Sequence, residues 1–211
     1  MQVAILLYDG LVALDAIGPY DVLKLMPQAD VRLVAADAGA VATDGPLTLV
    51  ADEGLGTVAR PDIVVVPGGP GATAASRDER LLSWLRCAHA QTLYTASVCW
   101  GSELLGAAGL LEGVKATSHW LVRDELSRHG AITVDERVVV SGRIITSAGV
   151  SAGIDMALRM VALLAGDEVA QRIQLTLEYA PEPPFADAGS PHTAAPALVA
   201  GMRDGYARSR R

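Results

Sequence analysis

Short apolar runs of strand length alternate with stretches of helical periodicity along most of the chain. Apolar runs bounded by turn residues predict strands, whereas apolar positions three and four residues apart predict helices. An alternation of this kind indicates βαβ units around a largely parallel sheet. We therefore predict an α/β fold, with a doubly wound sheet and helices on both of its faces.

The individual elements follow from these periods and from the turn residues between them. Strands are predicted at residues 2–8, 31–36, 62–67, 92–98, 115–117, 131–133, 138–141 and 144–146. Helices are predicted at residues 15–25, 81–90, 101–108, 120–128, 150–165 and 167–177. Gly130 is placed to end the fourth helix, and Asp167 is a candidate N-cap of the last. Asp135-Glu136 and Gly142-Arg143 predict tight turns between the last three strands.

The character of the chain changes at about residue 181, where prolines become frequent. They are Pro181, Pro183, Pro184, Pro191 and Pro196. Because proline lacks an N–H and clashes inside a helix, this spacing predicts that no regular helix forms there. We expect a single domain over residues 1–211, whose proline-rich end wraps over the domain or over a neighbouring subunit.

Composition narrows the expected partners and location. Hydrophobic residues make up 51% of the chain, which favours a single core. The net charge of −7 argues against nucleic-acid binding. Arg203, Arg208, Arg210 and Arg211 form a short basic tail that is more typical of a solvated terminus. The sequence has no basic leader and no apolar run of the roughly 20 residues that cross a bilayer. We expect a soluble, cytoplasmic protein.

The two cysteines, Cys87 and Cys99, belong to no CxxC pair and to no Cys/His cluster with metal-ligand spacing. This usage predicts a reducing compartment, no disulfide and no structural zinc. Cys87 lies inside a predicted helix, where a core or surface role is the default.

Cys99 lies where a strand is predicted to end and a glycine-containing helix to begin, in the segment TASVCWGS at residues 95–102. A side chain at such a turn lies at the carboxyl edge of the sheet, where open α/β folds bind ligands. The free N–H groups and the dipole of the following helix stabilise an anion, which predicts a lowered thiol pKa. Cys99 is therefore a candidate nucleophile, and the alternative is a buried small hydrophobic residue.

Three other features are expected at strand ends. The turn VVPGGPG at residues 65–71 can direct backbone N–H groups at an anion, or can be only a turn. Asp15 follows the first strand and is either a helix N-cap or a carboxyl with a raised pKa that transfers protons to and from the thiol site. His119 is either the base of a Cys–His pair or a hydrogen-bonded structural histidine. Surface positions are the default for His89, His129 and His192.

Three features together resemble the DJ-1/PfpI superfamily: the strand-to-helix turn at Cys99, which we call the elbow, the Pro-Gly-Gly turn, and the acid after the first strand. More narrowly, the chain resembles the isocyanide (isonitrile) hydratases of that superfamily, and the similarity runs nearly end to end. It rests on Leu14-Asp15 with Gly18-Pro19, ATSHW at 116–120, TSAGVSAGID at 146–155, QLTLEY at 174–179 and PPF at 183–185. An Asp at position 15, where many members carry Glu, also fits this branch.

The resemblance implies a flavodoxin-like fold, a homodimer with active sites near its interface, a small-molecule substrate, and no metal or organic cofactor. It assigns Cys99 as nucleophile, Asp15 as proton carrier and the N–H groups of Gly69 and Trp100 as anion donors. One position departs from the pattern, because hydratases of this kind usually carry threonine where this chain has Trp100. An indole cannot replace a hydroxyl that donates and accepts, so a pocket of different shape is expected.

The reaction implied by the resemblance is addition of the Cys99 thiolate to an isonitrile carbon, followed by hydration to an N-substituted formamide. One alternative is a Cys99-dependent glyoxalase or deglycase that acts on carbonyl compounds. The other is a redox sensor or ligand-binding module in which Cys99 is oxidised without turnover.

Overall fold

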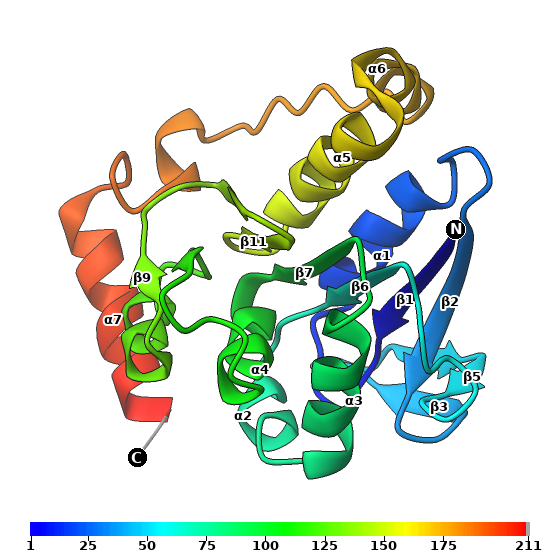
Figure 1. Ribbon diagram of the computed structural model, residues 1–211. Helices are drawn as coiled ribbons and strands as arrows, with labels where there is room; N and C mark the ends of the chain where they lie inside the picture. The colour runs from blue at the N-terminus through cyan, green and yellow to red at the C-terminus, as the bar shows by residue number, and fades with distance from the viewer. Residues whose placement is uncertain (210–211) are drawn as a thin grey trace. The chain divides into compact units, whose positions relative to one another are not determined.

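The computed structural model describes residues 1–209, and seven strands within them form one sheet (Figure 1). Its strands are β1 (Gln2–Leu6), β2 (Asp30–Ala35), β5 (Glu53–Gly54), β6 (Ile63–Val66), β7 (Tyr94–Val98), β10 (Val138–Ser141) and β11 (Ile144–Ser147). The strand order is β10-β11-β7-β6-β1-β2-β5, and every neighbouring pair is parallel except β10 with β11. The predicted α/β fold with a mostly parallel sheet is confirmed.

The order of the strands creates a switch point beside β1. The chain passes from β1 to β2 on one side, and then returns to place β6 and β7 on the other side of β1. All four residues of β6 are buried, as are four of the five in β1 and in β7. Strands covered on both faces have continuous apolar runs, which is why these three strands are so clear in the sequence.

Helices cover both faces of this sheet (Figure 1). One face carries α1 (Ala13–Leu23), α5 (Ala152–Ala165) and α6 (Asp167–Thr176), and the other carries α2 (Ala72–Ala75), α3 (Glu79–His89) and α4 (Ser102–Ala107). Helix α3 buries its apolar face and starts at Asp78, whose side chain accepts a hydrogen bond from the Arg80 N–H. Gly18 lets α1 approach α5, since a Cβ there would lie 3.1 Å from Ile154 Cγ1.

Two small sheets flank the main one, and part of this region differs from the prediction. Strands β3 (Gly39–Ala42) and β4 (Thr48–Ala51) form an antiparallel hairpin that the sequence analysis missed, and β8 (Lys115–Ala116) pairs with β9 (Ile132–Thr133). The predicted helix at 120–128 is a 3₁₀ helix, η2 (Arg123–His129), which ends at Gly130 as expected, with φ 74°. Residues 142–143 form the predicted hairpin turn, whereas 135–136 connect strands of different sheets.

Residue contacts divide the chain into two compact units, of which the first is Met1–Leu177 and the second begins at Glu178. The second unit contains η3 (Ala186–Gly189) and α7 (Pro196–Ser209). The expectation that its prolines exclude a helix is wrong, because Pro196 occupies the first position of α7, where a missing N–H costs nothing. Arg203 and Arg208 of the basic tail lie on α7, and Arg210 and Arg211 lie outside the described residues.

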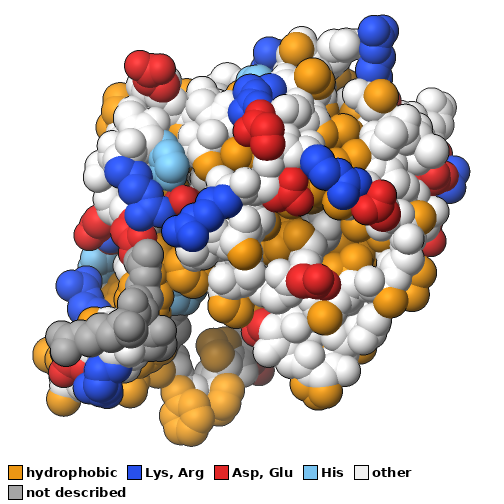
Figure 2. All heavy atoms as spheres, turned by 90° about the horizontal axis from the view of Figure 1, so that it is seen from below, with side chains coloured by type: hydrophobic (Ala, Val, Ile, Leu, Met, Phe, Trp, Pro, Cys, Tyr) orange, Lys and Arg blue, Asp and Glu red, His pale blue; other side chains and the backbone are white. Residues whose placement is uncertain are grey.

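The surface of the described chain shows no marked segregation of charge on the face in Figure 2, where basic and acidic side chains lie beside one another. None of the helices within residues 1–209 combines the length and the apolarity needed to span a membrane.

Candidate active site

Three loops meet at the switch point, and glycines allow their backbones to approach closely. They are the loops after β1, β6 and β7. A Cβ on Gly68 would lie 2.8 Å from Val98 O and 2.9 Å from Gly101 N, so the turn after β6 lies directly against the elbow after β7. A Cβ on Gly69 would lie 2.6 Å from both Gly10 O and Val12 N, against the loop after β1. The glycines thus bring these loops within reach of one another.

Cys99 lies at this meeting point in a strained backbone conformation. It follows β7 directly and opens η1 (Cys99–Gly101), with φ 55° in the left-handed region that non-glycine residues seldom adopt. Its N–H donates to Ala148 O at 2.9 Å, and 6% of the residue is exposed. The structure therefore places Cys99 on a strand-to-helix elbow at the carboxyl edge of the sheet.

The pKa of the Cys99 thiol is raised to about 12, contrary to the lowered value expected from the sequence. Burial is the main cause, and the negative charge of Asp15 is the second. The backbone N–H groups of Trp100 and Val150 bond to the sulfur and act in the opposite direction, but their effect is smaller. Amides of the elbow do stabilise the anion, as predicted, yet desolvation and the neighbouring carboxylate outweigh them.

Asp15 is completely buried beside the thiol, and it does not cap its helix. The N-cap of α1 is Val12, so the alternative of an N-capping Asp15 is wrong. One carboxyl oxygen, Oδ2, accepts the Gly68 N–H at 2.9 Å, and the carboxyl also forms a hydrogen bond with the Cys99 thiol. Burial and, to a smaller extent, the charge of Asp44 raise the pKa of Asp15 to about 7, although these two bonds act in the opposite direction.

Above the Asp15 pKa of about 7, the two groups together hold one proton. With Asp15 ionised and Cys99 protonated, the thiol donates to the carboxylate, which is the arrangement that the raised thiol pKa favours. A carboxylate in this position can take the thiol proton as the sulfur attacks an electrophile, and can then return it to the product. The pair is thus able to carry out covalent catalysis with proton transfer.

Tyr8 is a third group at the site, and it was not among the residues expected there. Its hydroxyl donates to Pro67 O at 2.6 Å, and burial together with the charges of Asp15 and Cys99 holds its pKa well above its usual value. Tyr8 therefore stays a neutral hydrogen-bond donor next to the reactive pair. Its position, two residues beyond the end of β1, was the available signal, because parallel strands direct their carboxyl ends to the ligand edge.

His119 lies near the site but does not act on the thiol within the described structure. Its Nδ1 accepts the Leu121 N–H at 3.3 Å, and its ring lies 5.9 Å from that of Trp120. A Cβ on Gly149 would lie 2.8 Å from His119 Cδ2, so the ring supports the loop that supplies the Val150 N–H. Burial lowers the pKa of His119, which keeps the imidazole neutral. Among the described residues, the groups acting on the Cys99 pKa include neither His119 nor Gly69.

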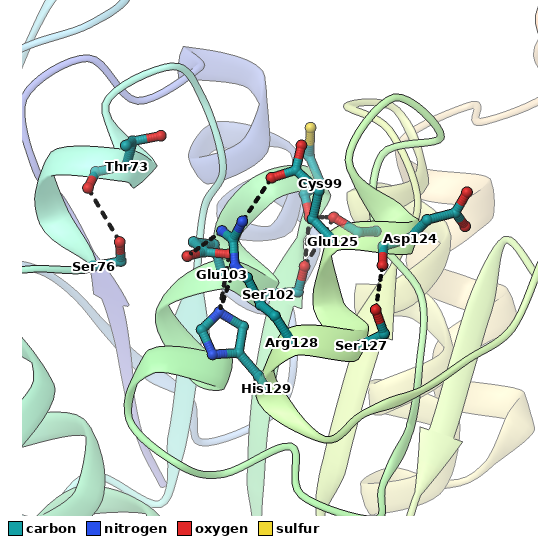
Figure 3. Close-up of polar contacts among 11 residues, drawn as sticks. Thr73, Ser76, Cys99, Ser102, Glu103, Asp124, Glu125, Ser127, Arg128 and His129 are labelled. Carbon is teal, nitrogen blue, oxygen red and sulfur yellow. Dashed lines mark hydrogen bonds and ion pairs between the residues drawn. The ribbon is translucent and has the colours of Figure 1, made fainter. Parts of the chain in front are cut away.

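The helix that follows the elbow is anchored by buried charge (Figure 3). Glu103 on α4 pairs with Arg128 at 2.8 Å and with His129 Nε2 at 3.2 Å, and both partners belong to η2. These pairs tie the start of α4 to η2 and so limit movement of the elbow.

Over the described residues, no three His, Cys, Asp or Glu side chains lie together in a way that could hold a metal ion. The second cysteine, Cys87, is exposed on α3.

Comparison with known proteins adds relatives for most of the chain. The isonitrile hydratase of Pseudomonas putida is 45% identical over 199 residues, which are 94% of this chain and 87% of that protein. A glutathione-independent glyoxalase of Caenorhabditis elegans is 31% identical over 51% of this chain and 57% of that protein. The crystal structure of a ThiJ/PfpI family protein from Pseudomonas syringae matches with a TM-score of 0.95 and 40% identity, over 98% of this chain and 86% of that one.

A match to a family model agrees with these relatives. The model described as the DJ-1/PfpI family matches residues 1–163, which include the first strand, the glycine turn and the cysteine elbow. Because this match spans more than half of the sequence and is accompanied by relatives that align over nearly all of it, the chain belongs to the DJ-1/PfpI family.

Proposed function

We propose that this protein hydrates an isonitrile to an N-substituted formamide, with Cys99 as nucleophile and Asp15 as proton carrier. The observation that carries the proposal is the buried Cys99–Asp15 pair in a chain that is 45% identical to an isonitrile hydratase over 94% of its length. The substrate is a small molecule, in keeping with a reactive pair that is almost entirely buried.

The first half of the reaction forms a covalent intermediate. As Cys99 Sγ bonds to the terminal isonitrile carbon, Asp15 takes the thiol proton, so that no free thiolate needs to accumulate at neutral pH. Asp15 then gives this proton to the same carbon, which yields a thioimidate on Cys99 and an ionised Asp15. The raised pKa of Asp15, about 7, suits both transfers.

The second half uses one water. Asp15 takes a proton from the water as the water oxygen adds to the thioimidate carbon, and Asp15 passes this proton to the substrate nitrogen. As the C–S bond of this adduct breaks, Asp15 takes the hydroxyl proton of the adduct and gives it to the departing sulfur, which releases the formamide and restores the protonated thiol. The Trp100 and Val150 N–H groups stabilise the departing sulfur anion, and the Gly69 N–H stays a proposed donor to the anion formed on the substrate.

Isonitrile turnover is the direct test. Full-length protein incubated with an alkyl isonitrile should produce the formamide, and Cys99→Ala and Asp15→Asn should each lower the rate by about 100-fold or more. Cys87→Ala is the matched control, because Cys87 is an exposed thiol outside the site. Absence of turnover in the wild type would contradict the proposal, as would turnover that persists in Cys99→Ala.

A second candidate activity acts on carbonyl compounds and is favoured by the identity of the chain to a glyoxalase. Trp100 is a second reason to consider this activity, because an indole stands where a hydratase is expected to carry a hydroxyl next to its nucleophile. Methylglyoxal consumption that requires Cys99, with isonitriles left intact, would establish this alternative. If Cys99 forms a sulfinate under peroxide and neither substrate is consumed, a redox-sensing role is supported instead.

We further propose that the protein acts in the cytoplasm as a homodimer and without nucleic acid. The two free thiols, Cys87 and Cys99, suit a reducing compartment, and the net charge of −7 opposes binding to a polyanion. Light scattering of the purified protein tests the oligomeric state.

A further inference from the structure

Two buried serine hydroxyls meet the backbone carbonyl of Cys99, a group that takes no part in the reaction scheme above. Ser118 Oγ lies 2.8 Å from Cys99 O, and Ser102 Oγ lies 3.1 Å from the same oxygen. The two hydroxyls are 2.9 Å apart. Ser102 is fully buried and Ser118 is 1% exposed, so water does not compete for these bonds. Figure 3 shows Ser102 beside Cys99 at the start of α4.

The number of hydroxyl protons limits how many of these three contacts can be hydrogen bonds at once. Each hydroxyl carries one proton, so the three contacts cannot all be hydrogen bonds at the same time. The two shorter distances favour a relay in which Ser102 donates to Ser118 and Ser118 donates to Cys99 O. The carbonyl then accepts from a hydroxyl that is itself polarised by a second one.

The Cys99 carbonyl and the Trp100 N–H belong to one rigid peptide unit and point in opposite directions. Any group that holds the carbonyl oxygen therefore also fixes the direction of the N–H, which lies in the same plane on the opposite side of the C–N bond. That N–H bonds to the Cys99 sulfur. A hydrogen bond at the oxygen also polarises the peptide and strengthens its N–H as a donor.

We propose that Ser118 and Ser102 are positioning residues that hold the Cys99–Trp100 peptide so that its N–H stabilises negative charge on the Cys99 sulfur. Cys99 needs such support, because its φ of 55° is strained and persists only where neighbouring groups hold it. Ser118 follows β8 and Ser102 opens α4, so the carbonyl is held from two separate segments. The two serines act on the thiol itself, whichever substrate the site takes.

The test measures the rate of Cys99 alkylation by iodoacetamide as a function of pH, in full-length protein carrying Cys87→Ser. Isonitrile turnover is not the readout, so failure of the hydratase proposal would not affect the result. Ser118→Ala should slow alkylation by about tenfold and shift the apparent thiol pKa upward, since one hydrogen bond acting on a charged group is lost. Ser118→Thr keeps the hydroxyl and should restore the wild-type profile.

Ser76→Ala is the matched control. The Ser76 hydroxyl donates to Thr73 O, three residues earlier, at 3.1 Å, as Ser102 approaches Cys99 O, and Figure 3 shows it on a separate helix. This variant should keep both the alkylation rate and the apparent pKa of the wild type.

Ser102→Ala gives a second and independent measurement, which also serves if Ser118→Ala does not fold. Because Ser102 acts through Ser118 in the relay, Ser102→Ala should have the smaller effect and the double variant should be no slower than Ser118→Ala. A wild-type pH profile in both single variants would overturn the proposal, even if their melting temperatures fell. Effects that simply add in the double variant would overturn the relay.

Discussion

Burial acts on Asp15 and Cys99 in the same direction, since it penalises the charged form of each acid. The pKa of Asp15 rises to about 7 and that of Cys99 to about 12, so the protein keeps its nucleophile protonated and its base poised near neutral pH. Asp15 has no exposed surface, so its ionised form is poorly solvated and lowers the free energy of unfolding.

Asp15→Asn tests this cost. Asp15 binds its proton more tightly in the folded protein than in the unfolded chain, where the pKa is 3.8, so its contribution to stability is lost as the pH rises through about 7. At about pH 8 the variant should have a free energy of unfolding about 2–4 kcal/mol above that of the wild type, and near pH 4 the difference should vanish. Urea denaturation at the two pH values measures it.

Asp44→Asn is the matched variant for the same pH dependence. The charge of Asp44 raises the pKa of Asp15, so its removal should let Asp15 ionise at lower pH. The acid limb of the Cys99 reactivity profile, which is the rise in alkylation rate as Asp15 ionises, should then move to lower pH without loss of reactivity. An unchanged acid limb in Asp44→Asn, or a stability difference for Asp15→Asn that does not depend on pH, would contradict the assignment.

Among the elements, the contact between the turn after β6 and the elbow after β7 is made of backbone on both sides. Gly68 lies against Val98 and Gly101, and its N–H holds Asp15. Backbone atoms cannot rotate away as a side chain can, so this contact tolerates no added atom.

Gly68→Ala should therefore displace the elbow. Its Cβ would lie within 3.0 Å of Val98 O and Gly101 N, and we expect a loss of about 2–3 kcal/mol in the free energy of unfolding together with slower Cys99 alkylation. Gly56→Ala is the control, since a Cβ there has no described neighbour within 4 Å. Chemical denaturation of both variants measures the difference, and equal stability would refute the steric argument.

At the scale of the whole molecule, the buried hydrophobic residues of the described chain all lie before residue 178. The first unit, Met1–Leu177, thus holds the sheet, its helices and the reactive pair. Phe185, Leu198 and Met202 in the second unit are exposed.

A chain ending at Leu177 should fold by itself. We expect a single cooperative unfolding transition and retention of Cys99 alkylation. The free energy of unfolding should fall by less than about 2 kcal/mol, which is the contribution expected from burying one large side chain. Calorimetry and alkylation check the two expectations. A truncated chain that lacks a cooperative transition would show that the second unit completes the fold.

Local periodicity was sufficient to predict β1, β6, β7 and the helices around them, because strands buried on both faces must be apolar throughout. It was insufficient for β3 and β4, which are short, partly exposed and without such a run. The helix α7 was missed for a different reason, since a proline at the first helical position resembles a helix breaker in sequence.

The sequence by itself determined the alternation of the main buried strands with the helices around them, and the placement of Cys99, Asp15 and the glycine turn after their strands, since these depend on short-range pattern. Tertiary structure alone decided the direction of the thiol pKa and the partners that act on it. Tyr8, Ser118 and Val150 reach the site through folding, from segments that share no local pattern with the cysteine elbow. Desolvation depends on everything packed around a group, and for this reason the lowered thiol pKa expected from the helix dipole has the wrong sign.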